Sequence, residues 1–358
     1  MNDTIRDMKT VDVIIPVYKP DDKFKRLLRM LDRQTYPVSR VIIINTEEKY
    51  FNAFFYGTRE LEKYHNLLIR HISAFEFDHG KTRRYGVSLS DADYFICMTD
   101  DAVPEDTSLV ENLLKPLEEG KAAVSYARQL PGKHAPETER FSRQFNYPEK
   151  SKRKTSADLK KLGIKTFFCS NVCAAYNREI YEELGGFEKH IIFNEDMVFA
   201  SKVIDAGYAI QYCAEAKVIH SHHYNNLQQF KRNFDLGVSQ ACYPEIFSRV
   251  SSTGEGKKLV RQTAEYLRKK KMSGRIFGMY VTSAYKYFGY QCGKHYTVLP
   301  KKLVLKFTSN PVYWQKDGEE AIRVNVNSGF GRSGEEDSWN RNLKILKREP
   351  DPREETEE

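Results

Sequence analysis

The sequence predicts an α/β fold in which helices cover both faces of a sheet and a basic, helical extension follows. Short apolar runs alternate with helical patterns between residues 11 and 101. This alternation is typical of parallel strands that are connected by helices. Of the 358 residues, 40% are hydrophobic and 13% are aromatic, so the chain can bury a large core and is not a disordered chain.

Four buried strands are predicted in the first hundred residues, because short apolar runs without alternation are typical of strands covered on both faces. They lie at residues 11–17, 41–44, 67–72 and 94–98. The first helix should begin at Asp21 or Asp22, which can cap its free amides, continue to Leu31 and stop before Pro37. A second helix is predicted over residues 81–90.

The second half of the chain predicts strands and helices around an irregular segment. Residues 131–165 are polar and rich in Lys, Pro and Ser, which favours a mobile loop. A strand is expected over residues 166–176, and one or two more within 208–220. Further helices are expected at residues 106–119, 178–184, 195–206, 227–241 and through most of 257–306.

We expect three parts in the chain: a domain over residues 1–245, a helical aromatic region over 246–310 and an irregular segment over 311–358. Residues 349–358 carry six acids and one arginine, which predicts a disordered tail.

Positive charge is concentrated in one block. The net charge is +8, and residues 257–306 hold ten lysines and three arginines against one acid, Glu265. Such a block is typical of a surface for anionic lipid or another polyanion, and a solvated helix face explains it equally well.

The sequence also predicts the compartment. The six cysteines lack the spacing of a metal site, so buried, reduced thiols are expected. No signal peptide is predicted, and no window reaches the roughly 20 apolar residues of a spanning helix. The expected location is the cytoplasm, either in solution or at a membrane surface.

Two carboxylates, Asp100 and Asp101, directly follow the strand predicted at residues 94–98. In parallel sheets, ligands bind beyond the C-terminal ends of the strands. Carboxylate oxygens there suit Mg²⁺ or Mn²⁺, and such an ion would neutralise a diphosphate leaving group. An acidic pair that caps the turn before Pro104 would give the same pattern.

Two other polar clusters follow later in the chain. Glu195 and Asp196 open a predicted helix, where an acid can be a general base or an ordinary N-terminal residue. His220 and His222 end the last predicted strand and point to the same side of it. One of them could join the metal or bind the diphosphate, and buried histidines with satisfied hydrogen bonds are the alternative.

The segment Asp78–Arg83 predicts an anion site. Gly80 permits a tight turn, and Lys81 and Arg83 fall in the first turn of a helix, where backbone amides and cations attract phosphate. The alternative is a merely basic first turn, which is unfavourable for the helix itself.

Together these segments resemble a family 2 glycosyltransferase with the GT-A fold, a Rossmann-like mixed sheet. The matching pieces are VDVIIPVYKP, VIIINTEE, FDHGKTRRYG, FICMTDDAVP, GGFEKHIIFNEDMVFASKVIDAGY and HSHHY, which cover roughly residues 10–245. FDHGKTR, MTDDAVP and HSHHY are similar to the rhamnosyltransferase branch, whose donor is dTDP-L-rhamnose and whose members invert the anomeric configuration.

The resemblance implies a role for each matching position on the donor side. Donor-binding positions are Pro16, Val17, Tyr18, Asn45, Thr46, Lys81, Arg83 and Asp100. The first three would line the nucleoside pocket, whereas Asn45 or Thr46 stands where the family more often has an acid. Lys81 and Arg83 would contact phosphate or nucleoside. Asp100 stands where the branch often has Gln, and would contact ribose or sugar.

The resemblance also implies the catalytic positions. Asp101 matches the metal-binding acid of the family, and His220 or His222 would add a contact on the metal side. Asp196 matches the catalytic base, with Glu195 as its neighbour.

The expected reaction moves L-rhamnose from dTDP-β-L-rhamnose to a hydroxyl of a lipid-linked saccharide during synthesis of a cell-surface polysaccharide. A donor such as UDP-hexose or UDP-galactofuranose is one alternative, and a non-catalytic nucleotide-binding scaffold is another. Residues 257–306 are expected to contact the anionic inner face of the membrane. No nucleic-acid motif occurs, so nucleic acid is not an expected partner, and a homo-oligomer interface is the third alternative for this block.

Overall fold

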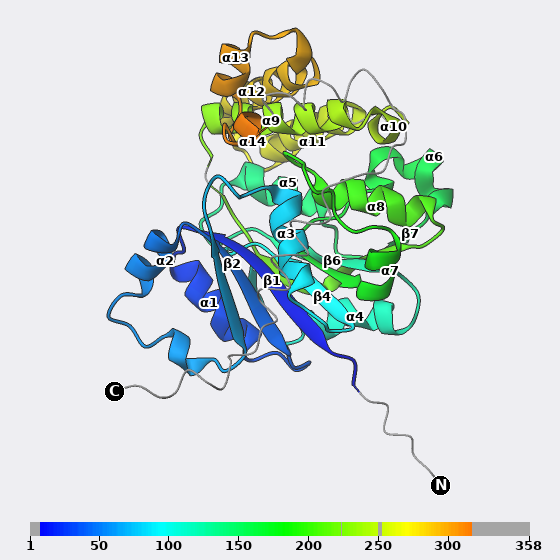
Figure 1. Ribbon diagram of the computed structural model, residues 1–358. Helices are drawn as coiled ribbons and strands as arrows, with labels where there is room; N and C mark the ends of the chain where they lie inside the picture. Colours follow the sequence, from blue (N-terminus) through cyan, green and yellow to red (C-terminus); the bar gives the residue numbers. More distant parts are fainter. Residues whose placement is uncertain (1–7, 223, 250–252, 317–358) are drawn as a thin grey trace, which may run out of the picture. The chain divides into compact units, whose positions relative to one another are not determined.

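Nine strands form one sheet in the described part of the chain (Figure 1). The computed structural model describes residues 8–222, 224–249 and 253–316. The strand order is β3-β2-β1-β4-β8-β6-β9-β5, and β7 pairs with β9. The strands are β1 (Val11–Tyr18), β2 (Arg40–Thr46), β3 (Leu67–Ile72), β4 (Tyr94–Met98), β5 (Val103–Pro104), β6 (Val124–Leu130), β7 (Lys152–Lys154), β8 (Cys173–Asn177) and β9 (Ile210–Ile219).

The sheet is mixed, and its strand directions determine which residues meet. Strands β3, β2, β1 and β4 are parallel, and β8 is antiparallel to both β4 and β6. Strand β9 is parallel to β6. The C-terminal ends of β1, β4, β6 and β9 therefore lie at the same edge of the sheet, together with the N-terminal end of β8.

Helices cover both faces of this sheet (Figure 1). They are α1 (Asp22–Leu31), α2 (Glu48–Phe55), α3 (His79–Ser88), α4 (Leu109–Glu118), α5 (Glu137–Asn146), α6 (Leu159–Leu162), α7 (Arg178–Glu183), α8 (Glu195–Asp205), α9 (Asn226–Cys242), α10 (Pro244–Phe247), α11 (Thr253–Lys269), α12 (Ile276–Lys294), α13 (Lys301–Phe307) and α14 (Tyr313–Lys316). Neighbouring side chains of β1 point into different cores: Ile14 packs with α3, α7 and α8, and Ile15 with α1, α2 and α4.

The predicted fold class is confirmed, and most predicted elements lie within a few residues of the observed ones. The Asp21 side chain accepts a hydrogen bond from the Lys23 amide and caps α1. That helix ends at Leu31, well before Pro37. The proposed division at residues 245 and 310 stays a prediction, and the acidic tail at residues 349–358 lies outside the described residues.

The loop predicted over residues 131–165 is wrong, since this segment holds α5, β7 and α6. Helix α5 buries no residue completely, and apart from Phe141 and Phe145 its sequence is polar. It is held instead by α11, where the ring of Tyr266 packs 4.8 Å from that of Phe141 and its hydroxyl donates to Glu137 (2.6 Å).

Two strands also differ from the prediction. Strand β6 was not predicted, because Ser125, Arg128 and Gln129 interrupt its apolar run. The strand expected over residues 166–176 is shorter and begins only at Cys173. The residues before it turn back toward α8 instead of pairing with the sheet, because Asn171 bonds to the first residues of that helix.

Helices α9 and α12 cross at very short distance beyond the sheet. A Cβ atom added to Gly293 would lie 2.0 Å from the carbonyl oxygen of Phe234, and one added to Gly289 would lie 2.2 Å from that of Phe230. Glycine is therefore required at both positions for this contact. Within the described residues, no helix combines the length and apolar character needed to cross a membrane.

Candidate active site

Three candidate metal ligands meet at the edge of the sheet. Asp101 follows β4, and His220 and His222 follow β9. The ligand atoms of the three side chains all lie within 4.8 Å of one another. His220 Nε2 lies 3.4 Å from Asp101 Oδ1, and His222 Nδ1 lies 3.5 Å from Asp101 Oδ2. The topology causes this meeting, because β4 and β9 end at the same edge.

A polar network behind His220 sets which ring nitrogen is free. Its Nδ1 lies 3.0 Å from Gln129 Oε1, an atom that can only accept, so the hydrogen is favoured on Nδ1 and the lone pair on Nε2. Arg143 donates to the same Oε1 through Nη1, and its Nη2 lies 3.2 Å from Nδ1. Arginine can only donate, so this second contact opposes a hydrogen on Nδ1, and we assign the tautomer from the shorter contact with Gln129. The Nε2 atom is buried and lacks a hydrogen-bond partner, as expected for a metal ligand.

The protonation states of these residues suit metal binding at neutral pH. Burial raises the pKa of Asp101, but the adjacent His220, His222 and Lys23 outweigh it, and the pKa lies well below its usual range. Burial lowers the pKa of His220, and burial with the neighbouring His220 lowers the pKa of His222 to about 4. Because the pKa values of His220 and His222 are both lowered, both imidazoles are neutral near pH 7. The three candidate metal ligands are therefore one carboxylate and two neutral imidazoles.

This donor set fits a divalent cation. One carboxylate with two neutral imidazoles is a common ligand combination for first-row metals. Mg²⁺ prefers oxygen ligands, and Mn²⁺ accepts nitrogen more readily, so the two imidazoles favour Mn²⁺. The buried, unpartnered Nε2 of His220 supports such an ion independently.

An acidic pair opens α8, in which Glu195 is buried and Asp196 is half-buried. The backbone amides of Asn171 and Met197 donate to the two Asp196 oxygens (2.9 and 2.8 Å). Glu195 Oε1 accepts hydrogen bonds from Arg83 Nη1 and Asn171 Nδ2, both at 3.1 Å. The charge of Glu195 is therefore balanced by Arg83. The hydrogen bonds described for Asp196 come instead from neutral backbone amides.

The environment of Asp196 suits a general base. Burial, and after it the charge of Glu195, raises the pKa of Asp196 well above its usual range. A carboxylate with a raised pKa accepts a proton more readily than an ordinary one near neutral pH. Asn194, just before the pair, has φ 64°, a left-handed conformation that is often found at functional sites.

The metal ligands and the acidic pair are joined through Gln129. Its Nε2 donates to the hydroxyls of Tyr147 (2.6 Å) and Ser170 (3.0 Å), while its oxygen faces His220. Ser170 precedes Asn171, which binds both acids of α8. Neither Gln129 nor Asn171 was predicted from the sequence, because each is a single polar residue without a motif around it.

The predicted nucleoside positions lie at the ends of β1 and β2, and they differ in exposure. Tyr18 is 50% exposed, and its ring meets Tyr50 edge-on at 5.8 Å. Val17 is 1% exposed and packs in the core, so only its backbone can face a ligand. Asn45 and Thr46 are buried, and each has a side-chain oxygen without a partner. Pro16 is half-buried between them and the core.

Asp100 lies between the nucleoside positions and the metal ligands. Its Oδ2 accepts a hydrogen bond from the Tyr18 amide (3.3 Å). Burial, and then the charge of Asp101, raises its pKa to about 7. Asp100 therefore joins the end of β1 to the end of β4, which fits a contact with the ligand between them.

The start of α3 corrects one part of the sequence analysis. Its amides are not free for an anion, because Asp78 Oδ1 accepts from the amides of Gly80 (2.8 Å) and Lys81 (3.0 Å). Arg83 is buried and pairs with Glu195. Lys81 is half-buried at the same turn. Donor contacts by Lys81 and Arg83 stay predictions.

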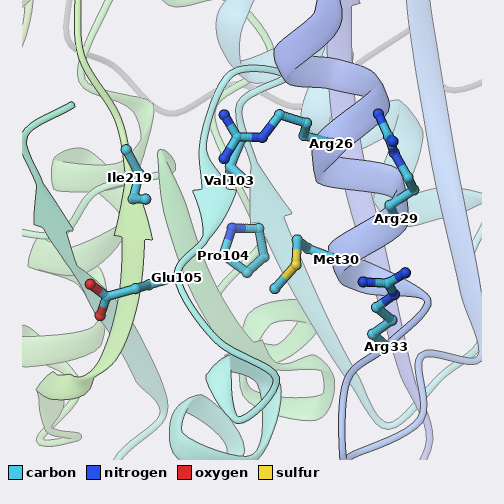
Figure 2. A pocket seen from close by; sticks show the side chains of 8 residues that line it. All are labelled: Arg26, Arg29, Met30, Arg33, Val103, Pro104, Glu105 and Ile219. Carbon is cyan, nitrogen blue, oxygen red and sulfur yellow. The ribbon is translucent and has the colours of Figure 1, made fainter. Parts of the chain in front are cut away.

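A separate hollow of about 260 Å³ lies between α1 and β5 (Figure 2). Figure 2 shows Arg26 and Arg29 of α1, and Arg33 just after it, on one side of the hollow. Pro104 and Ile219 lie on the other side. Its lining is Arg26, Arg29, Met30, Arg33, Val103, Pro104, Glu105 and Ile219. None of the three candidate metal ligands lines it, so it is a feature apart from the site described above.

Comparisons with known proteins identify the family of the chain. The family model for glycosyl transferase family 2 matches residues 12–185. The chain is 37% identical to the O-antigen chain rhamnosyltransferase RfbN of Salmonella typhimurium over 306 residues, which cover 85% of this chain and 96% of that protein. It is 36% identical to the O-antigen chain rhamnosyltransferase WbaN of Salmonella anatum over 310 residues, or 86% of this chain and 96% of that one.

Solved structures of similar fold include one with a bound sugar nucleotide. It is the mannosyltransferase PcManGT from Pyrobaculum calidifontis in complex with GDP-Man and Mn²⁺. The TM-score is 0.51 at 14% identity, and the match covers 90% of this chain and 89% of that one. At this identity the likeness concerns the fold alone.

Proposed function

The chain belongs to glycosyl transferase family 2, and from this premise we propose that it is a rhamnosyltransferase of cell-surface polysaccharide synthesis. The donor that we propose is dTDP-β-L-rhamnose, and the acceptor is a hydroxyl of a lipid-linked saccharide. The names of the two Salmonella relatives support the sugar and the type of product. Glycosyl transfer itself follows from membership of the family.

One observation carries the proposed site: Asp101, His220 and His222 gather at the same sheet edge as Asp196. Transfer from a sugar nucleotide requires that the diphosphate is stabilised at one point and that the acceptor hydroxyl is deprotonated at another. Gln129, Ser170 and Asn171 connect the two points through contacts of 3.0 Å or less, so the relative positions of the two points are fixed before substrate binds.

The proposed reaction is a single displacement. Asp101, His220 and His222 would hold Mn²⁺ or Mg²⁺, which supplies positive charge to the departing diphosphate. Asp196 takes the proton from the acceptor hydroxyl while the oxygen forms a bond to the anomeric carbon. The bond from that carbon to the diphosphate oxygen breaks, and its electron pair leaves with dTDP. Attack from the face opposite the leaving group inverts the anomeric configuration, as in inverting glycoside hydrolysis.

We place the donor between the ends of β1, β2 and β4. The positions proposed to contact it are Pro16, Val17, Tyr18, Asn45, Thr46, Lys81, Arg83 and Asp100. The exposed ring of Tyr18 suits stacking with a base, and the unpartnered oxygens of Asn45 and Thr46 suit polar contacts with it. Glu195 holds Arg83 in place. The contribution of Glu195 to the reaction is therefore the support of Asp196.

The proposed location is the cytoplasm at the inner face of the cell membrane, where a lipid-linked acceptor would be found. The basic residues at 257–306 are the part that we propose meets this anionic surface.

A thermal-shift panel with Mn²⁺ tests the donor, since a ligand that binds the folded state raises the melting temperature according to its concentration and Kd. We expect a larger shift with dTDP-rhamnose than with UDP-hexoses or UDP-galactofuranose. Transfer assays with the same donors then test the reaction. A larger shift and faster transfer with a UDP-sugar would contradict the rhamnose donor. Absence of transfer and hydrolysis with every donor would favour a nucleotide-binding scaffold.

A further inference from the structure

Helix α12 is fixed to α9 along one side. Gly289 and Gly293 bring its backbone against α9, where an added Cβ would meet a carbonyl oxygen at 2.2 or 2.0 Å. The Tyr290 hydroxyl donates to Gln240 of α9 (2.7 Å), and the Thr282 hydroxyl donates to Asn226 (2.8 Å). These contacts fix which side of α12 faces outward.

The outward side of α12 carries exposed aromatic rings. Phe277 is 79% exposed and Phe288 is 61% exposed, with Tyr280, Tyr285 and Tyr287 between 42% and 49%. With about 100° per residue, these five positions project from one side of the helix. Exposed rings at this density mark a surface that another molecule covers.

The sequence that includes these rings and the helix after them carries charge of one sign. From Tyr266 to Lys316 the sequence contains no acid. The helix that follows, α13, adds the exposed residues Lys301, Lys302 and Lys306. A partner that covers the rings must therefore carry negative charge near its apolar part.

Two of the three alternatives for this surface fit less well than lipid. A second copy of the chain would bring two basic faces together, which their mutual repulsion opposes. A nucleic acid offers anionic charge, but the sequence contains no nucleic-acid-binding motif. Tyrosine and phenylalanine beside lysine are the residues that occupy the boundary between lipid headgroups and acyl chains.

We propose that the outer face of α12, with the lysines of α13, docks the protein on a membrane surface that contains anionic lipid. Phe277 and Phe288 enter the headgroup boundary, and Lys301 and Lys302 pair with lipid phosphates. The docking face is the new assignment. It rests on the proposed function in one respect: access to a lipid-linked acceptor is the reason for docking.

The docking face is also connected to the candidate active site. Helix α9 begins at Asn226, four residues after His222. Tyr224 stacks on the His222 ring at 4.9 Å, and Arg232 of α9 lies 4.8 Å from the centre of the Tyr224 ring. Because α12 is fixed to α9, docking through α12 holds the metal ligands at a constant position relative to the lipid surface.

Co-sedimentation with vesicles tests the docking face. The full chain is mixed with vesicles of phosphatidylcholine alone or with phosphatidylglycerol, and the bound fraction is measured at low and high salt. We expect binding only to the anionic vesicles, with loss at high salt.

The double variant Phe277→Ser/Phe288→Ser should bind about tenfold more weakly or worse, because two phenyl rings lose their burial. Lys301→Gln/Lys302→Gln should lose about 30-fold, since each lysine near an anionic surface contributes a factor of about five.

The control is Tyr56→Ser, which removes a ring that is 89% exposed and lies outside this face. It should bind like the natural protein. Equal binding by all variants, equal binding to neutral vesicles, or no binding by the natural protein would overturn the proposal. Tighter binding to RNA than to anionic vesicles would overturn it in favour of nucleic acid.

Transfer to a water-soluble saccharide acceptor separates this proposal from the proposed function. We expect the Phe277→Ser/Phe288→Ser variant to keep this transfer while it loses vesicle binding. Loss of both would overturn the docking role, since the rings would then support the fold or the reaction. Vesicle binding without any transfer by the natural protein would contradict the rhamnosyltransferase function and leave the docking face standing.

Discussion

Charged side chains at the sheet edge around Asp101 and Asp196 are buried and bonded to one another, whereas the outer face of α12 exposes aromatic rings beside lysines. At the edge, Glu195 pairs with Arg83, and Gln129 links His220 to Ser170. On α12, Phe277 and Phe288 are more than half exposed.

This difference separates two kinds of functional surface. A catalytic site must hold its groups in position before the substrate arrives, so its polar groups are bonded to each other in advance. A docking surface gains its free energy only on contact, so its apolar groups remain exposed until then. Variants at the sheet edge should therefore change rate and metal affinity, and variants on α12 should change location or stability.

The largest effect is expected from Asp101→Asn, which removes the only carboxylate of the candidate metal site. We expect transfer to fall on the order of 10⁴-fold, because a metal ion contributes several kcal/mol to the stability of the transition state. Chelation of metal from the natural protein should give a similar loss that Mn²⁺ restores. The control Asp91→Asn changes a side chain that is 92% exposed and should keep full activity. Unchanged metal-dependent binding of dTDP by Asp101→Asn, measured by calorimetry, would remove Asp101 from the metal site.

Asp196→Asn tests the base at the same edge. The amide keeps the shape but cannot take a proton, so kcat should fall about 10²–10⁴-fold. Donor affinity should change little, because Asp196 contacts backbone amides and not the proposed donor positions. Asp205→Asn at the end of the same helix, an exposed partner of Arg249, is the matched control. Near-natural kcat for Asp196→Asn with both substrates saturating would show that another group takes the proton.

The pH dependence of the rate should report the environment of Asp196. Burial and Glu195 raise its pKa, and a base works only when deprotonated. With metal saturating, kcat/KM should therefore be full above the raised pKa and fall about tenfold per pH unit below it. The other titratable groups around Asp196 include the Arg83 cation and the neutral Cys97, Cys169, Tyr147 and Tyr176. A profile that stays flat down to the ordinary carboxylate range near pH 4 would contradict this assignment.

Gln129→Leu should have a smaller effect, through His220. Without the amide oxygen, the Nδ1 hydrogen of His220 loses its acceptor, and loss of such a contact typically lowers metal affinity about 10–100-fold. Titration of Mn²⁺ against the activity measures this change. Gln240→Leu is the matched control, because it also removes a buried amide, bonded to Tyr290. It should cost similar stability and leave Mn²⁺ affinity unchanged. Equal Mn²⁺ affinity in both variants would assign Gln129 to folding alone.

The case of Gln129 shows how far the sequence predicts this molecule. The four parallel strands were predicted because their apolar runs are continuous, and Asp101, Asp196 and the two histidines stood out because polar groups follow buried segments. Gln129 lies in a strand whose polar residues follow no strand period, and its partners are 14 to 91 residues away in the chain. A contact of this kind depends on the order of the strands, which a local pattern does not contain.

Helix α5 and Arg83 show two other limits. Helix α5 is mostly polar, so its own sequence resembles a loop. The residue of α11 that bonds to Glu137, Tyr266, lies 129 positions later in the chain. Arg83 was expected at a phosphate because its residue type and position at a helix start suit that role. The structure pairs it with Glu195 (3.1 Å), a residue 112 positions later that no helix pattern could connect with it.

The smallest effect is expected at the contact between the two regions, from Gly293→Ala on α12. The added methyl group would lie 2.0 Å from the Phe234 carbonyl oxygen, so α12 must shift away from α9, at a typical cost of about 1–3 kcal/mol in the free energy of unfolding. Gly278→Ala on the same helix is the control, because its Cβ would meet nothing within 4 Å, and alanine favours a helix over glycine by up to about 1 kcal/mol. Thermal unfolding should therefore show a lower melting temperature for Gly293→Ala and an equal or higher one for Gly278→Ala. Equal melting temperatures would mean that α12 is not tightly packed on α9, and the sheet edge and the docking face would then move independently.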